Sequence, residues 1–328
     1  MRAPEFWTKQ GGLARVLAPL GAAYALGGDL RRRFAEPWRA PVPVVCVGNL
    51  TVGGTGKTPT VAALARTLTS QGRRVAILSR GYGGRLRGPS RVDPARHGAR
   101  DVGDEPLLLA RVAPVYVARD RKAGAEAAIA DGADLLLMDD GFQNPQIEKT
   151  LSLVVVDGAA GFGNRSVFPA GPLREPVATG FARAHALVMI GADANAAAFG
   201  FGGPVLRADL VPTDKAAWAG VPVVAFAGIG RPQKFFDTLA SLGAALRGTY
   251  PFADHHAYKR RQIERLLIIA KEQHAVLVTT EKDFVRVPAD LAAQIRTVPV
   301  ELRFADPPTL LRLLAQGLAQ GLAGGALK

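Results

Sequence analysis

The sequence predicts an α/β protein with a mainly parallel sheet covered by helices on both faces. Short, continuously apolar runs alternate with helix-like segments along most of the chain, which is typical of strands buried on both sides. A length of 328 residues allows one large domain or two ordinary ones, and a hydrophobic content of 48% is ample for their cores. A second, smaller α/β/α domain and an N-terminal amphipathic helix complete the expected architecture.

Residues 1–40 are expected to form an N-terminal membrane-interface helix region. The uncharged stretch 16–28 is too short for a spanning helix, which needs about 20 apolar residues, and no clear cleavage site marks a signal peptide. Apolar side chains nevertheless recur at helical spacing: Leu13, Val16, Leu17, Leu20 and Tyr24. This pattern favours a helix lying on a membrane surface. The alternative is an amphipathic helix packed on the protein's own core.

A glycine-rich loop joins the first predicted strand, 42–47, to a helix predicted over 59–70. Backbone N–H groups of such a loop can surround a phosphate, and the helix N-terminus adds a positive dipole end. Lys57 would reach the β- and γ-phosphates, and the Thr58 hydroxyl would bind Mg²⁺. The expected nucleotide contacts are Thr51, Val52, Gly53, Gly54, Thr55, Gly56, Lys57 and Thr58. The loop therefore predicts a P-loop NTPase-type sheet with ATP and Mg²⁺ as cofactors, although Thr51 stands where the general pattern has glycine.

The P-loop core domain is expected over residues 41–203. Its further strands are predicted at 74–78, 115–118, 135–138, 151–156 and 186–190, with helices at 122–130 and 177–184. Right-handed crossovers place the carboxyl ends of such strands, and hence the ligand site, along one edge of the sheet.

A linker over 204–218 and a smaller C-terminal α/β domain over 219–328 are expected next. That domain shows strands at 221–226, 244–249 and 275–279 and helices at 232–242 and 260–272. The linker has extended character, and the alternating segment 297–304 could pair with it. The two domains would leave a cleft between them.

Acidic residues at element ends are the candidates for chemistry. Asp139 and Asp140 end an apolar strand, where a metal-binding carboxylate of a phosphate-loop enzyme should lie, and the sequence leaves open which of them holds the metal. Asp254 adjoins His255 in a loop, and an aspartate can orient a histidine ring and tune its basicity. Asp104 precedes an apolar helix, so capping that helix is as good an explanation as catalysis.

The charge of the chain indicates the kind of partner, and its cysteine content limits the kinds of disulfide and metal site. The chain has 41 Lys+Arg against 28 Asp+Glu, a net charge of +13, which suggests nucleic acid, an acidic membrane surface or a phosphorylated substrate. Solvated faces account equally well for any single arginine. Cys46 is the only cysteine, which excludes a disulfide framework or cysteine zinc site and fits a reducing cytoplasm.

Several segments, in this order, resemble the tetraacyldisaccharide 4′-kinase (lipid A 4′-kinase) family. They read VGNLTVGGTGKTP (47–59), SRGYG (79–83), VGDEP (102–106), DDGFQ (139–143), GPLRE (171–175), FADHH (252–256) and TTEKD (279–283). The resemblance extends over nearly the whole chain, and this family shares the threonine at position 51.

The resemblance implies a kinase that transfers the γ-phosphate of ATP to the 4′-hydroxyl of a tetraacylated glucosamine disaccharide 1-phosphate. The product would be lipid IVA, made in lipid A biosynthesis at the cytoplasmic face of the bacterial inner membrane. The expected partners are this acylated disaccharide and an anionic membrane surface, with no nucleic acid.

Roles for individual residues follow as expectations from the same resemblance. Asp104 would accept the sugar proton with support from His255, and Lys57 and Asp140 complete the catalytic set. Thr58, with Asp139 or Asp140, would hold Mg²⁺. The remaining candidates are Glu175 on the metal side and Arg119, Gln143 and Arg174 for substrate or phosphoryl charge.

Two other classes compete with the kinase. A partition- or targeting-type ATPase that acts on a membrane or DNA carries an extra lysine in its loop, K-G-G-x-G-K-[ST], and this chain has Val52 there. A basic nucleic-acid-binding protein fits the arginine excess, but the chain shows no RNA-binding aromatic motif or zinc-finger spacing.

Overall fold

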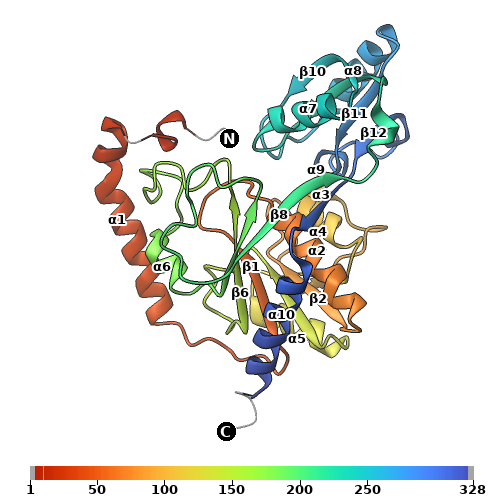
Figure 1. Ribbon diagram of the computed structural model, residues 1–328. Coiled ribbons are helices and arrows are strands. Elements are labelled where there is room, and N and C mark those ends of the chain that lie inside the picture. Colours follow the sequence, from red (N-terminus) through yellow and green to blue (C-terminus); the bar gives the residue numbers. More distant parts are fainter. Residues whose placement is uncertain (1–3, 10, 324–328) are drawn as a thin grey trace.

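The structure is a computed structural model that describes residues 4–9 and 11–323. Two sheets form two domains, the larger below and the smaller above it in Figure 1. The larger sheet has nine strands. Across the sheet they are β13 (Val300–Phe304), β8 (Val205–Pro212), β7 (Ala186–Ile190), β6 (Leu151–Asp157), β1 (Val44–Gly48), β5 (Leu135–Asp139), β2 (Val75–Ser79), β4 (Val115–Val117) and β3 (Ser90–Arg91).

The strands from β8 to β4 run parallel, and each edge strand pairs antiparallel with its neighbour. This confirms the predicted parallel sheet. Helices cover both faces: α2 (Lys57–Ser70), α4 (Asp104–Leu109) and α10 (Pro307–Ala323) lie on one, and α5 (Arg121–Ala130) and α6 (Val177–Phe181) on the other. The short helix α3 (Ala99–Val102) immediately precedes α4.

The central strand β1 shows why two helical layers are needed. Val45 and Val47 pack into the cluster that contains Leu64 of α2, whereas Val44 and Cys46 pack into the cluster on the opposite face. All of β1 is buried, because successive side chains of a strand point to opposite faces. Cys46 is thus a core residue, and burial raises the pKa of its thiol to about 12.

The smaller sheet is wholly parallel and has helices on both sides. Its strands, in order, are β10 (Ala245–Pro251), β9 (Pro222–Ala227), β11 (Val276–Thr280) and β12 (Ile295–Val298). The helix α7 (Pro232–Ser241) packs on one face and α8 (Arg260–Glu272) on the other. The remaining short elements here are α9 (Glu281–Phe284), η2 (Ala216–Trp218) and η3 (Ala292–Gln294).

The sheets divide the chain differently from the domain limits expected from the sequence. The expected linker, 204–218, contributes the full strand β8 to the large sheet, and β13 pairs with it from Val300–Pro212 to Phe304–Ala208. Leu310, Leu314 and Leu318 of α10 then pack into the core of the large domain. The end of the chain therefore returns to the first domain, and the smaller sheet occupies only 222–298. Long-range strand pairing, which has no local sequence signal, accounts for the difference.

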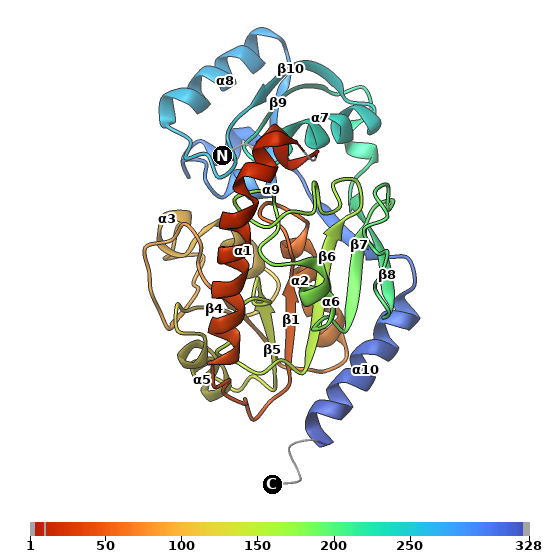
Figure 2. The ribbon, with the colours of Figure 1, turned by 90° about the vertical axis from the view of Figure 1, so that its left-hand side faces the viewer.

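The N-terminal helix α1 (Gly12–Arg33) runs along the outside of the large domain (Figures 1 and 2). It follows a single turn of 3-10 helix, η1 (Glu5–Trp7), and touches the domain along a narrow strip where Gly21 and Ala14 are buried. Its expected apolar face is largely exposed, including Val16 at 73% and Leu20 at 59%. The described helices include none that is long and apolar enough to cross a membrane.

Candidate active site

The phosphate loop lies between the end of β1 and the start of α2. Gly56 has a φ of 91°, and a Cβ there would lie 2.4 Å from Cδ1 of Ile190, so both backbone and space demand glycine. At Gly53 and Gly54, in contrast, a Cβ would meet open space. The loop is therefore packed on the side that faces the sheet and open on the side from which a phosphate would approach.

Buried polar groups hold the loop in this shape. The Asn49 amide donates to the Thr55 hydroxyl over 3.1 Å and lies 3.5 Å from that of Thr51. The Val52 N–H donates to the carbonyl of Pro172 over 2.7 Å. Because the Thr51 side chain is buried, threonine at this position supports the loop from within, and the missing glycine does not distort it.

Asp140 lies beside the loop between two cations. Lys57 Nζ is 3.7 Å from its Oδ1, and Arg174 donates to both carboxylate oxygens over 2.8 and 3.1 Å. Burial alone would raise the pKa of Asp140, but Lys57 and Arg174 outweigh it and hold that pKa below its ordinary value. Asp140 thus stays ionised and fixes the side chains of Lys57 and Arg174 at the loop.

Asp139 has a different environment. It ends β5 with 2% exposure, and its Oδ1 has no hydrogen-bond partner among the described residues. Burial, with smaller effects from Glu105 and Asp140, raises the pKa of Asp139 to about 7. A buried, ionised carboxylate lowers the stability of the folded protein unless a cation compensates its charge. Asp139 is therefore the better placed of the two aspartates to accept a divalent cation, with Thr58 in the first turn of α2 as the second oxygen.

The described part of the chain holds no cluster of three or more His, Cys, Asp or Glu side chains arranged for a metal. Mg²⁺ does not need one, since it is usually bound by one or two carboxylates together with substrate phosphates and water. The residues around the loop therefore fit Mg²⁺ bound together with a nucleotide.

Glu175, expected on the metal side, is enclosed by arginines instead. Its carboxylate contacts the Arg183 guanidinium directly, lies 3.6 Å from Arg32 Nη1 of α1, and accepts from Gln143 Nε2 over 3.0 Å. With a side chain only 2% exposed, Glu175 already has the cations that a buried carboxylate requires. Its surroundings give it a structural role in which arginines, without a metal, compensate its charge.

Gln143 and Arg174, expected to bind substrate, also connect parts of the site. Gln143 Nε2 donates to the Asn49 carbonyl over 2.9 Å, and its Oε1 accepts from Arg174 over 3.3 Å. Both residues are half-buried, with the Arg174 side chain 25% exposed, so neither is closed off from an incoming substrate.

Asp104 and His255, which lie 151 residues apart, meet at the domain boundary. Asp104 is the first residue of α4 and is 4% exposed; its Oδ2 is 3.0 Å from His255 Nδ1 and 3.6 Å from Arg286 Nε. Burial would raise the pKa of Asp104, but His255, Lys282 and Arg286 together hold it below the ordinary value. The structure thus brings together the aspartate and histidine that the sequence had singled out.

Further contacts bring the smaller domain over the loop. Arg231 forms an ion pair with Asp157 at the end of β6, and Lys282 forms another with Glu105 over 3.0 Å. A Cβ on Gly230 would lie 3.8 Å from the Gly54 nitrogen. The small domain therefore covers the carboxyl ends of the large sheet, where the loop and Asp139 lie.

Arg119 is exposed, and its neighbour Arg121 is the buried arginine near the acidic pair. Arg121 is 3% exposed, and its Nε lacks a hydrogen-bond partner in the described part of the chain. Burial lowers the pKa of Arg121 to about 10, although Asp139 opposes this. The sequence singled out Arg119 alone, because spacing does not show that Arg121 turns inward, and a role for Arg119 in binding substrate stays a prediction.

Sequence reasoning also missed Lys282 and Arg286. Lys282 lies within the segment 279–283 that supported the family resemblance, so a signal for it existed. Arg286 had none, since nothing local distinguishes it from the other basic residues.

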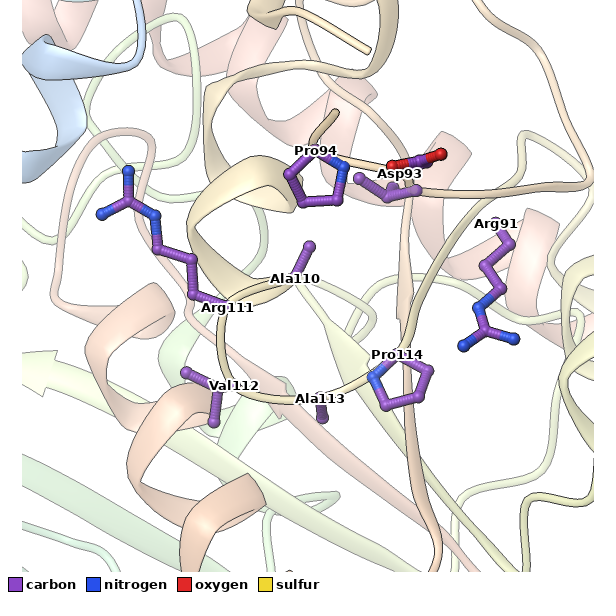
Figure 3. A pocket seen from close by; sticks show the side chains of 9 residues that line it. Arg91, Asp93, Pro94, Ala110, Arg111, Val112, Ala113 and Pro114 are labelled. Carbon is purple, nitrogen blue, oxygen red and sulfur yellow. The ribbon is translucent and has the colours of Figure 1, made fainter. Parts of the chain in front are cut away.

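A surface pocket of about 620 Å³ lies away from this site (Figure 3). Its lining comes from residues 91–94 and from 110–114, which lead into the amino end of β4, and Arg91 and Arg111 lie on opposite sides of it. The residues that line it include none of the loop, acidic or histidine residues described above.

Comparisons with known proteins identify the family of the chain. A family model described as Tetraacyldisaccharide-1-P 4′-kinase matches residues 13–319. Curated proteins named tetraacyldisaccharide 4′-kinase include one from Gluconacetobacter diazotrophicus, 56% identical over 319 residues, covering 96% of this chain and 97% of that protein. Another, from Rhodospirillum centenum, is 53% identical and covers 96% of each chain.

A solved structure of a family member has the same fold as this chain. The crystal structure of LpxK from Aquifex aeolicus in complex with ATP superposes with a TM-score of 0.77 at 27% identity, covering 94% of this chain and all of that one. Family model, relatives and fold therefore agree over nearly the whole chain, and the chain belongs to the tetraacyldisaccharide-1-P 4′-kinase family.

Proposed function

We propose that this protein transfers the γ-phosphate of ATP to the 4′-hydroxyl of tetraacyldisaccharide 1-phosphate, which yields lipid IVA in lipid A biosynthesis. One observation carries the proposal: the phosphate loop with Asp139 and the Asp104–His255 pair lie at the same boundary between two domains. A phosphate donor and a hydroxyl acceptor could therefore meet there with water excluded.

The loop amides and Lys57 hold the β- and γ-phosphates. Lys57 is already directed by Asp140, so little reorganisation is needed when a nucleotide binds. The ATP named with the Aquifex aeolicus structure supports ATP as the donor.

Thr58 and Asp139 would hold Mg²⁺, and the buried Asp139 oxygen, which has no hydrogen-bond partner in the described ranges 4–9 and 11–323, supports this assignment. The ion would neutralise charge on the phosphate oxygens. Arg174, aligned by Asp140, and Arg121, buried near Asp139, add positive charge around the transferred group.

Asp104 accepts the proton of the 4′-hydroxyl, and His255 supports it. A pKa held below its ordinary value makes Asp104 a weak base. A weak base suffices, because the transition state of phosphoryl transfer is loose and depends mainly on positioning and charge neutralisation.

The exposed face of α1 supports contact with a membrane surface. Val16, Leu20 and Phe34 are 73, 59 and 83% exposed, and the basic residues Arg31 and Arg33 end the helix. Apolar side chains beside arginines suit the interface of an anionic membrane. We place the protein on the cytoplasmic face of the bacterial inner membrane, where an acylated substrate would be accessible.

The decisive experiment incubates the full chain with γ-labelled ATP, Mg²⁺ and tetraacyldisaccharide 1-phosphate. Label transferred to lipid, absent with Lys57→Met and retained with the surface control Lys271→Met, supports the kinase. Lipid-independent hydrolysis of ATP would instead indicate a partition- or targeting-type ATPase. Salt-sensitive nucleic-acid binding without either activity would indicate the third class.

A further inference from the structure

Lys282 contacts both domains and the catalytic histidine at once. It lies on α9, in the small domain, with its side chain 22% exposed. Its Nζ is 3.0 Å from Glu105 Oε1 of the large domain and 3.3 Å from His255 Nε2. The same imidazole presents Nδ1 to Asp104 Oδ2 at 3.0 Å. His255 therefore lies between an ammonium group and a carboxylate.

The chemistry of these groups determines the protonation of the ring. A lysine ammonium has three donors and no acceptor, so it can bond to Nε2 only if that nitrogen carries a lone pair. Although burial lowers the pKa of Lys282, nearby carboxylates, Glu105 first, outweigh burial and raise it above the ordinary value, so the group is charged. A neutral imidazole whose Nε2 accepts must carry its hydrogen on Nδ1, which faces Asp104.

We propose that Lys282 is a positioning residue that holds His255 as the neutral Nδ1–H tautomer, with that hydrogen directed at Asp104. The inference rests on the proposed function, in which Asp104 accepts the sugar proton. The other tautomer would turn the Nδ1 lone pair towards the Asp104 carboxylate and place Nε2–H against the ammonium of Lys282. Both contacts would then be repulsive.

Lys282 also opposes the protonation of His255. Two carboxylates favour the imidazolium: Asp104 at Nδ1 and Asp254, 3.8 Å from Nε2. The remaining neighbours are Lys282 at Nε2 and the Tyr82 ring, whose centroid is 5.6 Å from that of His255, with Arg286 behind Asp104. Of the groups that contact the ring directly, Lys282 supplies the positive charge.

Glu105 makes this arrangement depend on the contact between domains. The Lys282–Glu105 ion pair crosses the boundary beside the Asp104–His255 pair. When the domains separate, His255 loses Asp104 and Lys282 loses Glu105 together. Because Lys282 and His255 both belong to the small domain, Lys282 still holds the tautomer, but the Nδ1–H faces Asp104 only when the domains are in contact.

The test measures the ring nitrogens directly in the full-length protein by ¹⁵N NMR of labelled histidine, with His255→Gln to assign the signal. The wild type should show Nδ1–H and a lone pair on Nε2 at neutral pH. In Lys282→Met, the His255 titration should move up by about one pH unit, as expected for the loss of a nearby like charge. Lys282→Arg should restore most of the wild-type value, and Lys271→Met should change nothing.

Turnover supplies the second measurement. The acid limb of the kcat/KM profile should shift upward by about one unit in Lys282→Met and return in Lys282→Arg, because an imidazolium pairs with Asp104 and weakens it as a base. A lysine that only joined the domains would lower the whole profile without moving that limb, which would refute the proposal.

A wild-type His255 with Nε2–H, or an unchanged titration in Lys282→Met, would likewise overturn the inference. The tautomer is read from the wild-type spectrum, so the proposal can be refuted even if Lys282→Met does not fold. The spectrum also needs no lipid substrate. Absence of lipid phosphorylation would therefore count against the proposed function alone, while the tautomer would still be decided by the spectrum.

Discussion

Breaking the ion pair of Glu175 should reveal how strongly a buried carboxylate depends on its arginines. The Glu175 side chain is 2% exposed, whereas that of Arg183 is 31% exposed. Replacing Arg183 with methionine leaves a buried charge with only Arg32, at 3.6 Å, and the Gln143 amide. Removal of one partner of a buried pair costs about 3–5 kcal/mol. Because Arg32 remains, we expect about 3 kcal/mol of lost stability.

Glu175→Gln should cost much less, although it removes the same pair. It eliminates the buried charge itself, an amide can still bond to Gln143, and the more exposed Arg183 can reach water. We expect about 1 kcal/mol, the size of one net hydrogen bond. In the Glu175→Gln background, Arg183→Met should then cost only about 1 kcal/mol. The cycle predicts a coupling of about 2 kcal/mol.

The assay is urea unfolding followed by circular dichroism, with Mg²⁺ titrations of activity on the same variants. Equal losses for both single variants and an additive double variant would refute the reasoning from burial. A tenfold or greater rise in the Mg²⁺ requirement of Glu175→Gln would show that this carboxylate binds the metal after all.

Four further predictions concern the site. Lys57→Met should lower kcat by about 10²–10³-fold, measured by lipid phosphorylation, because a preorganised cation at the phosphates is lost. Asp104 is easier to ionise folded than unfolded, so its stabilising effect is full at neutral pH and is lost as the pH falls below its ordinary value of 3.8. Unfolding midpoints of Asp104→Asn should therefore fall below wild type at pH 7 and converge with it well below pH 3.8. Gly56→Ala should destabilise the protein by about 1–2 kcal/mol in thermal unfolding, because of its positive φ, and more if Ile190 cannot move; a variant as stable as wild type would contradict the loop geometry. Arg231→Met should increase the radius of gyration in small-angle scattering and raise KM for ATP, since the ion pair to the end of β6 is lost; unchanged scattering would show that this pair does not hold the domains together.

Local patterns predicted the elements well. The helix expected over 260–272 is α8 with the same limits, and the strand expected over 151–156 is β6 with one more residue. Both segments have strong periodicity or continuous apolar character, so their burial follows from their own sequence. The strand–loop–helix context of the phosphate loop was equally readable, because the residues that form it are contiguous.

Long-range pairing was predicted only in part. The sequence indicates that the segment 297–304 pairs with the expected linker, and β13 does pair with it. The sequence does not show that this linker contains strand β8 of the large sheet. Only Pro299 separates β12 of one sheet from β13 of the other, and no local signal marks that change of domain.

By itself, the sequence determined the parallel α/β architecture, the phosphate loop and the identity of Asp104, Asp139 and His255 as polar groups at element ends. The tertiary structure decided what surrounds each of them. It paired Asp140 with Lys57 and Arg174, enclosed Glu175 with arginines and brought Lys282 to His255. It also left one oxygen of Asp139 without a hydrogen-bond partner among the residues that the structure describes. The physical reason is that a motif fixes which groups are present over a few residues, whereas protonation and charge depend on burial and on neighbours supplied by distant segments.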